Sequence, residues 1–258
     1  MEKKITDHLH LGEIVRTLLA PALRGYSRSC FDRISSSVAA DTAFDTTEIR
    51  YQRKQCPVKA TTPADADQIV EQIFSVFRER GQRHYGESVS EQEHALQTAE
   101  FARQYSEPDS LVLSCLLHDY GHMLHDLGEN IAEQGVDARH EELGAWLLKD
   151  WFPEEILQPI RQHVASKRYL CRRNTQYRDG LSPSSQRSLQ LQGGPMTEAE
   201  AVAFEALPFF DQCVRLRLYD DMGKVPQMPT ASIESYEPLI RRFLRPDASF
   251  AAAEVPSA

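Results

Sequence analysis

Four histidines are spaced along the chain at intervals that suit one helix plus a turn. His94, His118, His140 and His163 follow one another after 24, 22 and 23 residues, so successive helices could each direct one imidazole at a shared centre. His118 is followed at once by Asp119, at the end of the apolar run 111–117. A charged carboxylate is costly in an apolar setting unless it is compensated. Imidazole and carboxylate suit iron, manganese or zinc, and Asp119 could bridge two such ions.

A lone histidine on an apolar face is more often a core residue than a ligand. The regular spacing and the adjacent carboxylate favour the interpretation that the four histidines above are metal ligands. The remaining candidates lack that context, and we expect them to be ordinary surface residues: His8, His10, His84, His125 and Asp126. His122 follows His118 by one helical turn, so it is placed to act as a proton donor beside the centre.

Helix start signals precede most apolar segments from residue 62 onward. Ser90 with Glu93, and Thr197 with Glu200, each form a capping box. We expect helices at about 62–81, 90–105, 108–117, 138–150, 153–166, 198–206, 208–224 and 234–244. No segment alternates apolar and polar residues in the manner of a strand. The sequence therefore predicts an all-α fold.

Two segments depart from this helical pattern. Residues 167–196 are polar, basic and contain Gly193-Gly194-Pro195, so we expect a long functional loop there. Residues 1–60 are rich in serine and arginine and are interpreted as an N-terminal extension, which could be a transit peptide, a regulatory arm or an oligomerising arm. Residues 61–250 would form the catalytic domain.

Basic residues near the proposed centre could bind an anion. Lys167 lies one helical turn beyond His163, and Arg217 precedes Asp220 by three residues, so each pair shares a helix face. A doubly charged phosphorus-containing group calls for such cations together with hydroxyl donors. The alternative is a solvated basic loop, which is an equally good reading for Arg168, Arg172 and Arg173.

The overall composition limits the classes of partner. The net charge of 29 − 38 = −9 disfavours nucleic acid and anionic membrane surfaces. No apolar stretch approaches the roughly 20 residues of a membrane helix. The five cysteines are odd in number and include no CxxC pair, which is typical of a reducing, cytoplasmic location. A homo-oligomer remains possible.

The motif Leu117-His118-Asp119-Tyr120-Gly121-His122, with the upstream His94 and the late Tyr219-Asp220-Asp221, resembles the HD-domain superfamily over roughly residues 70–244. That resemblance implies a helical bundle in which one metal ion is bound by His94, His118, Asp119 and Asp220. Asp221 is the alternative to Asp220. His140 and His163 resemble the ligands of a second metal ion, with Asp119 as the bridge.

Two HD classes use a dinuclear site, namely phosphohydrolases and mixed-valent di-iron oxygenases. Further segments are similar to the oxygenases that act on hydroxyphosphonates: Tyr85-Gly86-Glu87, the stretch from His163 to Lys167, Leu181 to Ser185, Leu191 to Met196, and Arg217 before Asp220. This resemblance implies two iron ions and cleavage, by dioxygen, of the carbon–phosphorus bond of 2-amino-1-hydroxyethylphosphonate or its N-trimethyl analogue. Glycine or glycine betaine and phosphate would be the products.

The same resemblance assigns roles around the substrate. Tyr85 would cap an iron ion until substrate displaces it, and Glu87 would face the ammonium group. The phosphonate would be held by His122, Lys167, Ser185 and Arg217, with the loop 167–196 covering the substrate. The alternative activity is hydrolysis of nucleotides or phosphoesters by a dinuclear phosphohydrolase. A third possibility, outside enzymes, is a degenerate HD domain that serves as a binding module.

Overall fold

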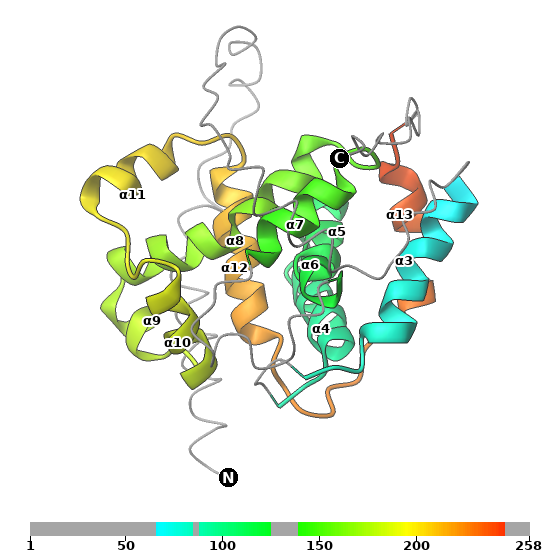
Figure 1. Cartoon of the computed structure of the whole chain (residues 1–258), viewed down its shortest axis with the longest axis horizontal. Helices are drawn as coiled ribbons and strands as arrows, with labels where there is room; N and C mark the ends of the chain where they lie inside the picture. Colours follow the sequence, from blue (N-terminus) through cyan, green and yellow to red (C-terminus); the bar gives the residue numbers. More distant parts are fainter. Residues whose placement is uncertain (1–65, 85–87, 125–138, 246–258) are drawn as a thin grey trace, which may run out of the picture.

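A computed structural model describes residues 66–84, 88–124 and 139–245, and every regular element in these ranges is a helix (Figure 1). The predicted all-α fold is confirmed. The predicted N-terminal extension, 1–60, lies outside the described residues, as do Tyr85, Glu87, His125 and Asp126. The elements are α3 (Ala66–Arg80), α4 (Glu91–Gln104), α5 (Asp109–Leu117), α6 (Tyr120–Leu124), α7 (His140–Leu148), α8 (Glu154–Arg173), α9 (Thr175–Asp179), α10 (Pro183–Leu191), α11 (Glu198–Glu205), α12 (Phe210–Met222), the 3-10 turn η2 (Ile233–Tyr236) and α13 (Glu237–Phe243).

The predicted capping boxes start two of these helices. Ser90 accepts a hydrogen bond from the backbone N–H of Glu93, whose side chain accepts from the backbone of Ser90, and α4 begins at the next residue. Thr197 and Glu200 form the same reciprocal pair before α11. Each box satisfies two backbone donors that a helix start would leave unpaired.

The helix α5 lies at the centre of the hydrophobic core. All of its residues from Leu111 to Leu117 are buried, as the continuous apolar run predicts. It packs against α4, α8 and α12, while α7 packs on α8 and α6. Figure 1 shows α9, α10 and α11 on one side of these central helices and α3 and α13 on the other. The end of α5 therefore delivers His118 into the interior.

The prediction of an irregular loop over 167–196 is wrong, because most of this segment is helical. The helix α8 runs on to Arg173, and α9 and α10 follow it. Ser182 caps α10 through a bond to the backbone N–H of Ser185, and Pro183 occupies the first turn. An irregular turn remains at 192–197, where Gly193 and Gly194 adopt φ angles of 91° and 71°, which favour glycine.

The basic residues of this segment are paired rather than simply solvated. Arg168 contacts Glu200 at 2.8 Å. Arg173 contacts Glu198 at 2.8 Å and Glu205 at 2.9 Å. These acids all lie on α11, some 25 to 32 residues later in the chain. The basic charge of α8 is thus compensated by a distant helix, which a local reading of the sequence does not reveal.

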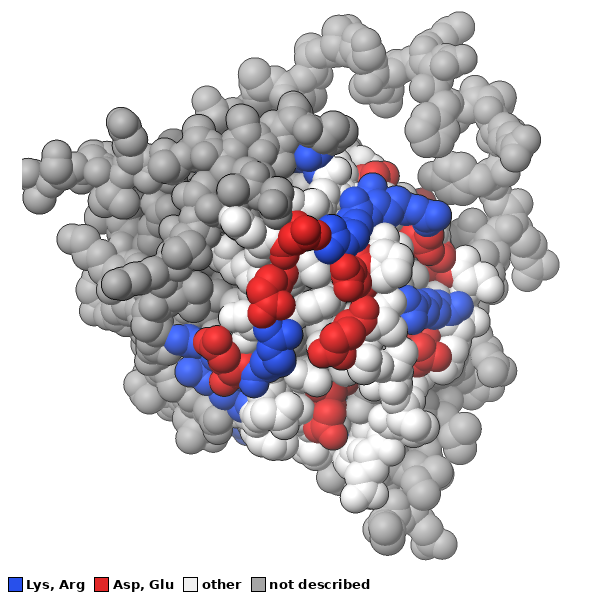
Figure 2. Space-filling view, turned by 90° about the vertical axis from the view of Figure 1, so that its right-hand side faces the viewer, with Lys and Arg blue, Asp and Glu red and all other residues white. Residues whose placement is uncertain are grey.

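The face on the α3 and α13 side carries charges of both signs. Figure 2 shows acidic and basic side chains interspersed over it. Arg241 of α13 pairs with Asp67 of α3 and with Glu237 of its own helix. Because the signs alternate, the described part of this face has no extended positive patch to which a polyanion could bind. Within the described ranges, no helix is long and apolar enough to cross a membrane.

Candidate metal centre

Asp119 lies between two pairs of histidines and presents one carboxylate oxygen to each pair. Its Oδ2 atom is 3.4 Å from His94 Nε2 and 3.2 Å from His118 Nε2. Its Oδ1 atom is 3.3 Å from His140 Nε2 and 3.5 Å from His163 Nε2. The two groups, His94-His118-Asp119 and Asp119-His140-His163, each gather their ligand atoms within 4.8 Å. The four predicted histidines therefore meet at one centre, with Asp119 shared.

Three of the imidazoles are oriented by backbone carbonyl groups. The Nδ1 atom of His94 lies 2.7 Å from the carbonyl oxygen of Gly223, that of His118 lies 2.8 Å from Cys115 O, and that of His163 lies 2.8 Å from Ile160 O. When Nδ1 donates its proton to a carbonyl, the Nε2 lone pair is free to bind a metal ion. The three rings are thus oriented with Nε2 toward the centre, as a metal ligand requires.

Asp220 and Asp221 of α12 both contact Arg217, but their other partners differ. Asp220 Oδ1 is 3.3 Å from His94 Nε2, and Asp220 Oδ2 is 3.9 Å from His118 Nε2. Asp221 instead accepts hydrogen bonds from Arg217 and from the Tyr177 hydroxyl, the latter at 2.5 Å. Asp220 is thus the carboxylate of the two that faces the first histidine pair.

The spacing and chemistry of these groups fit two metal ions. Metal–ligand bonds of about 2.1 Å that meet near a right angle place their ligand atoms about 3 Å apart. Within each pair, the Nε2 atoms are 3.2 Å apart for His94 and His118, and 3.0 Å apart for His140 and His163. The buried Oδ1 atom of Asp119 has no hydrogen-bond partner. A buried anionic oxygen without a donor calls for a cation at this position.

The electrostatics of the two pairs also favour cations. Burial disfavours the charged form of His94, but Asp119 and Asp220 outweigh burial and raise its pKa to about 10, so they stabilise positive charge at this point. Burial, with the neighbouring His140, lowers the pKa of His163 to about 3. His163 is therefore neutral at physiological pH, the form in which imidazole binds a metal ion.

His122 lies beside the second pair because two glycines let α6 approach α7 closely. A Cβ atom on Gly121 would lie 2.0 Å from the carbonyl oxygen of His140 and 2.9 Å from Gly144 N. Only glycine fits so near a backbone. The His122 ring stacks on His140 with 3.6 Å between centroids and 17° between planes. The structure thus places His122 against a candidate ligand.

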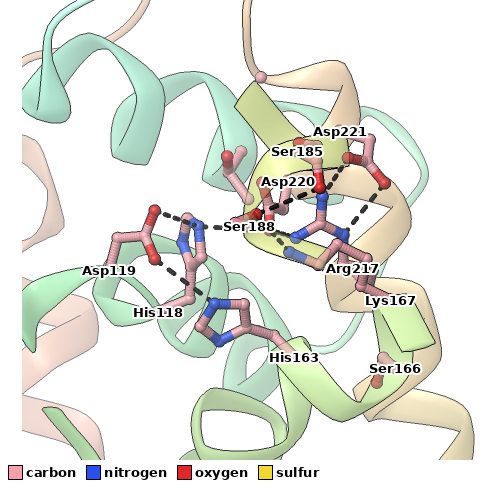
Figure 3. Close-up of polar contacts among 12 residues, drawn as sticks. His118, Asp119, His163, Ser166, Lys167, Ser185, Ser188, Arg217, Asp220 and Asp221 are labelled. Carbon is pink, nitrogen blue, oxygen red and sulfur yellow. Dashed lines mark hydrogen bonds and ion pairs between the residues drawn. The ribbon is translucent and has the colours of Figure 1, made fainter. Parts of the chain in front are cut away.

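A second cluster is formed by Lys167, Ser185, Ser188 and Lys224 and is called here the Lys–Ser cluster. Figure 3 shows Lys167, Ser185 and Ser188 on the Asp220 side of the centre. Lys167 Nζ donates to Ser188 Oγ at 2.8 Å, and Lys224 Nζ donates to Ser185 Oγ at 3.2 Å. Lys167 is only 3% exposed. Two ammonium groups and two hydroxyls in one place can bind a multiply charged oxyanion.

Arg217 is buried between the metal centre and the Lys–Ser cluster. Its Nη1 donates to Asp220 Oδ2 at 2.7 Å, and its Nη2 donates to Asp221. Its Nε lies 3.2 Å from the Tyr177 hydroxyl. Arg217 therefore fixes the orientation of Asp220 while it adds positive charge beside Lys167 (Figure 3).

Several residues at the site were missed by the sequence reasoning. Ser188 follows Ser185 by three residues, so a helix predicted over 183–191 would have placed both hydroxyls on one face. Lys224 follows Asp220 by four residues and reaches Ser185. The roles of Tyr177 and the buried Glu91 have no local signal in the sequence. Tyr85 and Glu87, both predicted at the site, lie outside the described residues.

Comparison with known proteins agrees with this architecture. The HD domain family matches residues 92–206. The chain is 40% identical to a [1-hydroxy-2-(trimethylamino)ethyl]phosphonate dioxygenase (glycine-betaine-forming) of Leisingera caerulea. That alignment spans 177 residues, which are 68% of this chain and 90% of the relative. The chain is 38% identical to a hydroxymethylphosphonate dioxygenase of Gimesia maris, in an alignment of 184 residues that covers 70% of this chain and 90% of the relative. An uncharacterized protein of Acanthamoeba polyphaga mimivirus is 30% identical over 180 residues, covering 69% and 82%.

The helical fold and the HD match define the class, an HD-domain protein with a candidate histidine–aspartate metal centre. Within that superfamily, the chain belongs to the family of phosphonate dioxygenases. It is accordingly an oxygenase that cleaves a small-molecule phosphonate with dioxygen.

Proposed function

We propose that the protein uses two iron ions to cleave the carbon–phosphorus bond of a 1-hydroxy-2-aminoethylphosphonate, with or without N-methyl groups. The products would be glycine or glycine betaine, and phosphate. One observation carries this proposal: Asp119 divides four histidines into two ligand groups, and the Lys–Ser cluster lies beside Asp220, which faces the first group. The two relatives named as dioxygenases of hydroxylated phosphonates support the choice of substrate class.

The proposed ligands form two groups that share Asp119. His94, His118, Asp119 and Asp220 would bind the first ion. Asp119, His140 and His163 would bind the second. Iron bound at this centre would supply the redox chemistry that allows dioxygen to react with the C1–H bond.

The overall reaction balances with dioxygen as the sole oxidant. The hydroxylated carbon C1 loses its bonds to hydrogen and phosphorus and becomes a carboxylate, while phosphorus leaves as phosphate. Four electrons pass from the substrate to one O2 molecule, whose two oxygen atoms enter the products, and one proton is released. No external reductant is required.

The protein side chains would bind and orient the substrate. Lys167, Lys224 and the hydroxyls of Ser185 and Ser188 would hold the phosphonate oxygens, with the charge of Arg217 close behind them. His122, stacked on His140, would donate or accept a proton near C1. Tyr85 as an iron cap and Glu87 as a partner of the ammonium group stay predictions.

The proposal is tested by product analysis with the iron-loaded protein. Wild-type protein is incubated with 2-amino-1-hydroxyethylphosphonate, its N-trimethyl analogue and hydroxymethylphosphonate, with and without oxygen. Nuclear magnetic resonance then identifies the carbon product, and a colorimetric assay measures phosphate. We expect glycine or glycine betaine, and phosphate, only under oxygen. Phosphate release from nucleotides or simple phosphoesters without oxygen would instead indicate the phosphohydrolase.

A further inference from the structure

Glu91 is a buried carboxylate to which none of the roles above is assigned. It is the first residue of α4 and precedes the candidate ligand His94 by one helical turn. Glu91 is only 4% exposed, and its Oε1 atom is buried without a hydrogen-bond partner. Burying a carboxyl oxygen with no donor is costly. Such an oxygen in a native site therefore calls for a partner that binds there.

The local structure of α4 does not account for this residue. The capping box is complete without it, because Ser90 and Glu93 supply both bonds. A carboxylate in the first turn can interact favourably with the helix dipole, but it can do so from an exposed position, as Glu93 does. Neither the cap nor the dipole requires Glu91 to be buried.

Glu91 and the Lys–Ser cluster place an acidic group and basic groups at different points around the centre. Burial, then the charge of Asp119, raises the pKa of Glu91, and the charges of His94 and His140 oppose the rise, so Glu91 lies close to both histidine pairs. Lys167 instead lies near Arg217 and Lys224, with Asp220 and Asp221 as partial compensation. A substrate that carries phosphonate on C1 and ammonium on C2 has the same separation of charge.

We propose that Glu91 accepts a hydrogen bond from the ammonium group of the substrate and thereby selects a primary ammonium over a trimethylammonium group. This inference rests on the function proposed above. A primary ammonium supplies both positive charge and an N–H donor for Oε1. A trimethylammonium group supplies the charge but no donor, so it would leave the buried oxygen unpartnered. Glu87, predicted for a similar role, lies outside the described residues; Glu91 is a carboxylate that the structure places beside the centre.

The test compares two substrates in three forms of the iron-loaded full chain. Wild type, Glu91→Gln and the control Glu100→Gln are assayed for kcat and KM with 2-amino-1-hydroxyethylphosphonate and with its N-trimethyl analogue. Glu100 lies on the same helix and contacts Gln104 on the surface, so its variant makes the same substitution away from the centre. Iron content and thermal midpoint are measured for each protein.

We expect wild type to prefer the primary ammonium substrate. Glu91→Gln should lower kcat/KM for that substrate by about 10- to 100-fold, mainly through KM, and should change the trimethyl substrate far less. Iron content should not change, and Glu100→Gln should behave as wild type. An equal loss on both substrates, a loss of iron, or a wild-type preference for the trimethyl substrate would overturn the inference and leave the proposed function intact. Absence of oxygen-dependent phosphate release in wild type would overturn both.

Discussion

His140 and His163 place their Nε2 atoms 3.0 Å apart, and both atoms face the same oxygen of Asp119. His163 has its Nδ1 atom on a backbone carbonyl, so its Nε2 atom carries a lone pair. Three electron-rich atoms converge at this point, an arrangement that a cation stabilises. The second pair is therefore expected to bind a metal ion, which distinguishes this site from a mononuclear HD centre.

Removal of either histidine of this pair should halve the metal content. His140→Ala and His163→Ala are each expected to bind about one metal ion per chain, where wild type binds about two, and to lose turnover. Metal analysis of the purified proteins measures the first effect, and phosphate release measures the second. The exposed His84, in neither ligand group, provides the control variant His84→Ala. Retention of two ions in His140→Ala or His163→Ala would refute the dinuclear assignment.

The two adjacent aspartates of α12 should respond differently to loss of charge. Asp220→Asn is expected to weaken the first metal site, because Asp220 faces His94. Asp221→Asn should keep both metal ions and weaken substrate binding through Arg217, which Asp221 and Tyr177 hold. Metal content and KM, measured on both variants, separate these effects. If Asp221→Asn lost a metal ion while Asp220→Asn did not, the ligand assignment would be reversed.

Gly223 positions His94 through its carbonyl oxygen and leaves no room for a side chain. A Cβ atom there would lie 2.5 Å from Thr98 Oγ1 and 3.2 Å from His94 Nδ1. We expect Gly223→Ala to lower the free energy of unfolding by about 1–3 kcal/mol and to reduce occupancy of the first metal site. Adding Thr98→Ala should recover part of the stability, since it removes the nearest atom. Gly180→Ala, where the nearest atom is 3.3 Å away, is the control; an equal loss there would argue against a specific role for Gly223.

The charge of Lys167 should make substrate binding depend on pH. Burial, then the charge of Arg217, lowers the pKa of Lys167 to about 7. The side chain is therefore charged below pH 7 and becomes neutral above it, so KM for the phosphonate should rise as pH increases through 7. Lys167→Arg stays charged and should show a weaker rise, whereas Lys167→Ala should have a high KM throughout with unchanged metal content. Because substrate ionisation is common to all three proteins, identical KM profiles would exclude Lys167 from the phosphonate site.

Much of the fold could be predicted because its signals are local. The capping boxes at Ser90 and Thr197 and the apolar run of α5 each depend on neighbouring residues, and the structure confirms these helices. The segment 167–196 was predicted wrongly because its basic residues are stabilised by acids on α11. The cap Ser182 and the adjacent Pro183 were the local signal that could have identified α10.

Part of the candidate site could likewise be predicted from the sequence, and part of it could not. Regular spacing along successive helices predicted a centre shared by four histidines, and the structure places the four around Asp119. Ser188, Tyr177 and Glu91 depend instead on which helices pack together, for example α8 against α12. Their contribution could not be inferred from spacing in a single sequence.

The central claim, that this centre performs an iron-dependent oxygenation, is tested most directly by the ratio of oxygen consumed to phosphate released. The protein is purified without oxygen, its iron content is determined, and an oxygen electrode follows the reaction with 2-amino-1-hydroxyethylphosphonate and its trimethyl analogue. We predict about two iron ions per chain and one O2 consumed per phosphate, with no phosphate released in the absence of oxygen. Phosphate release that continues without oxygen would contradict the account.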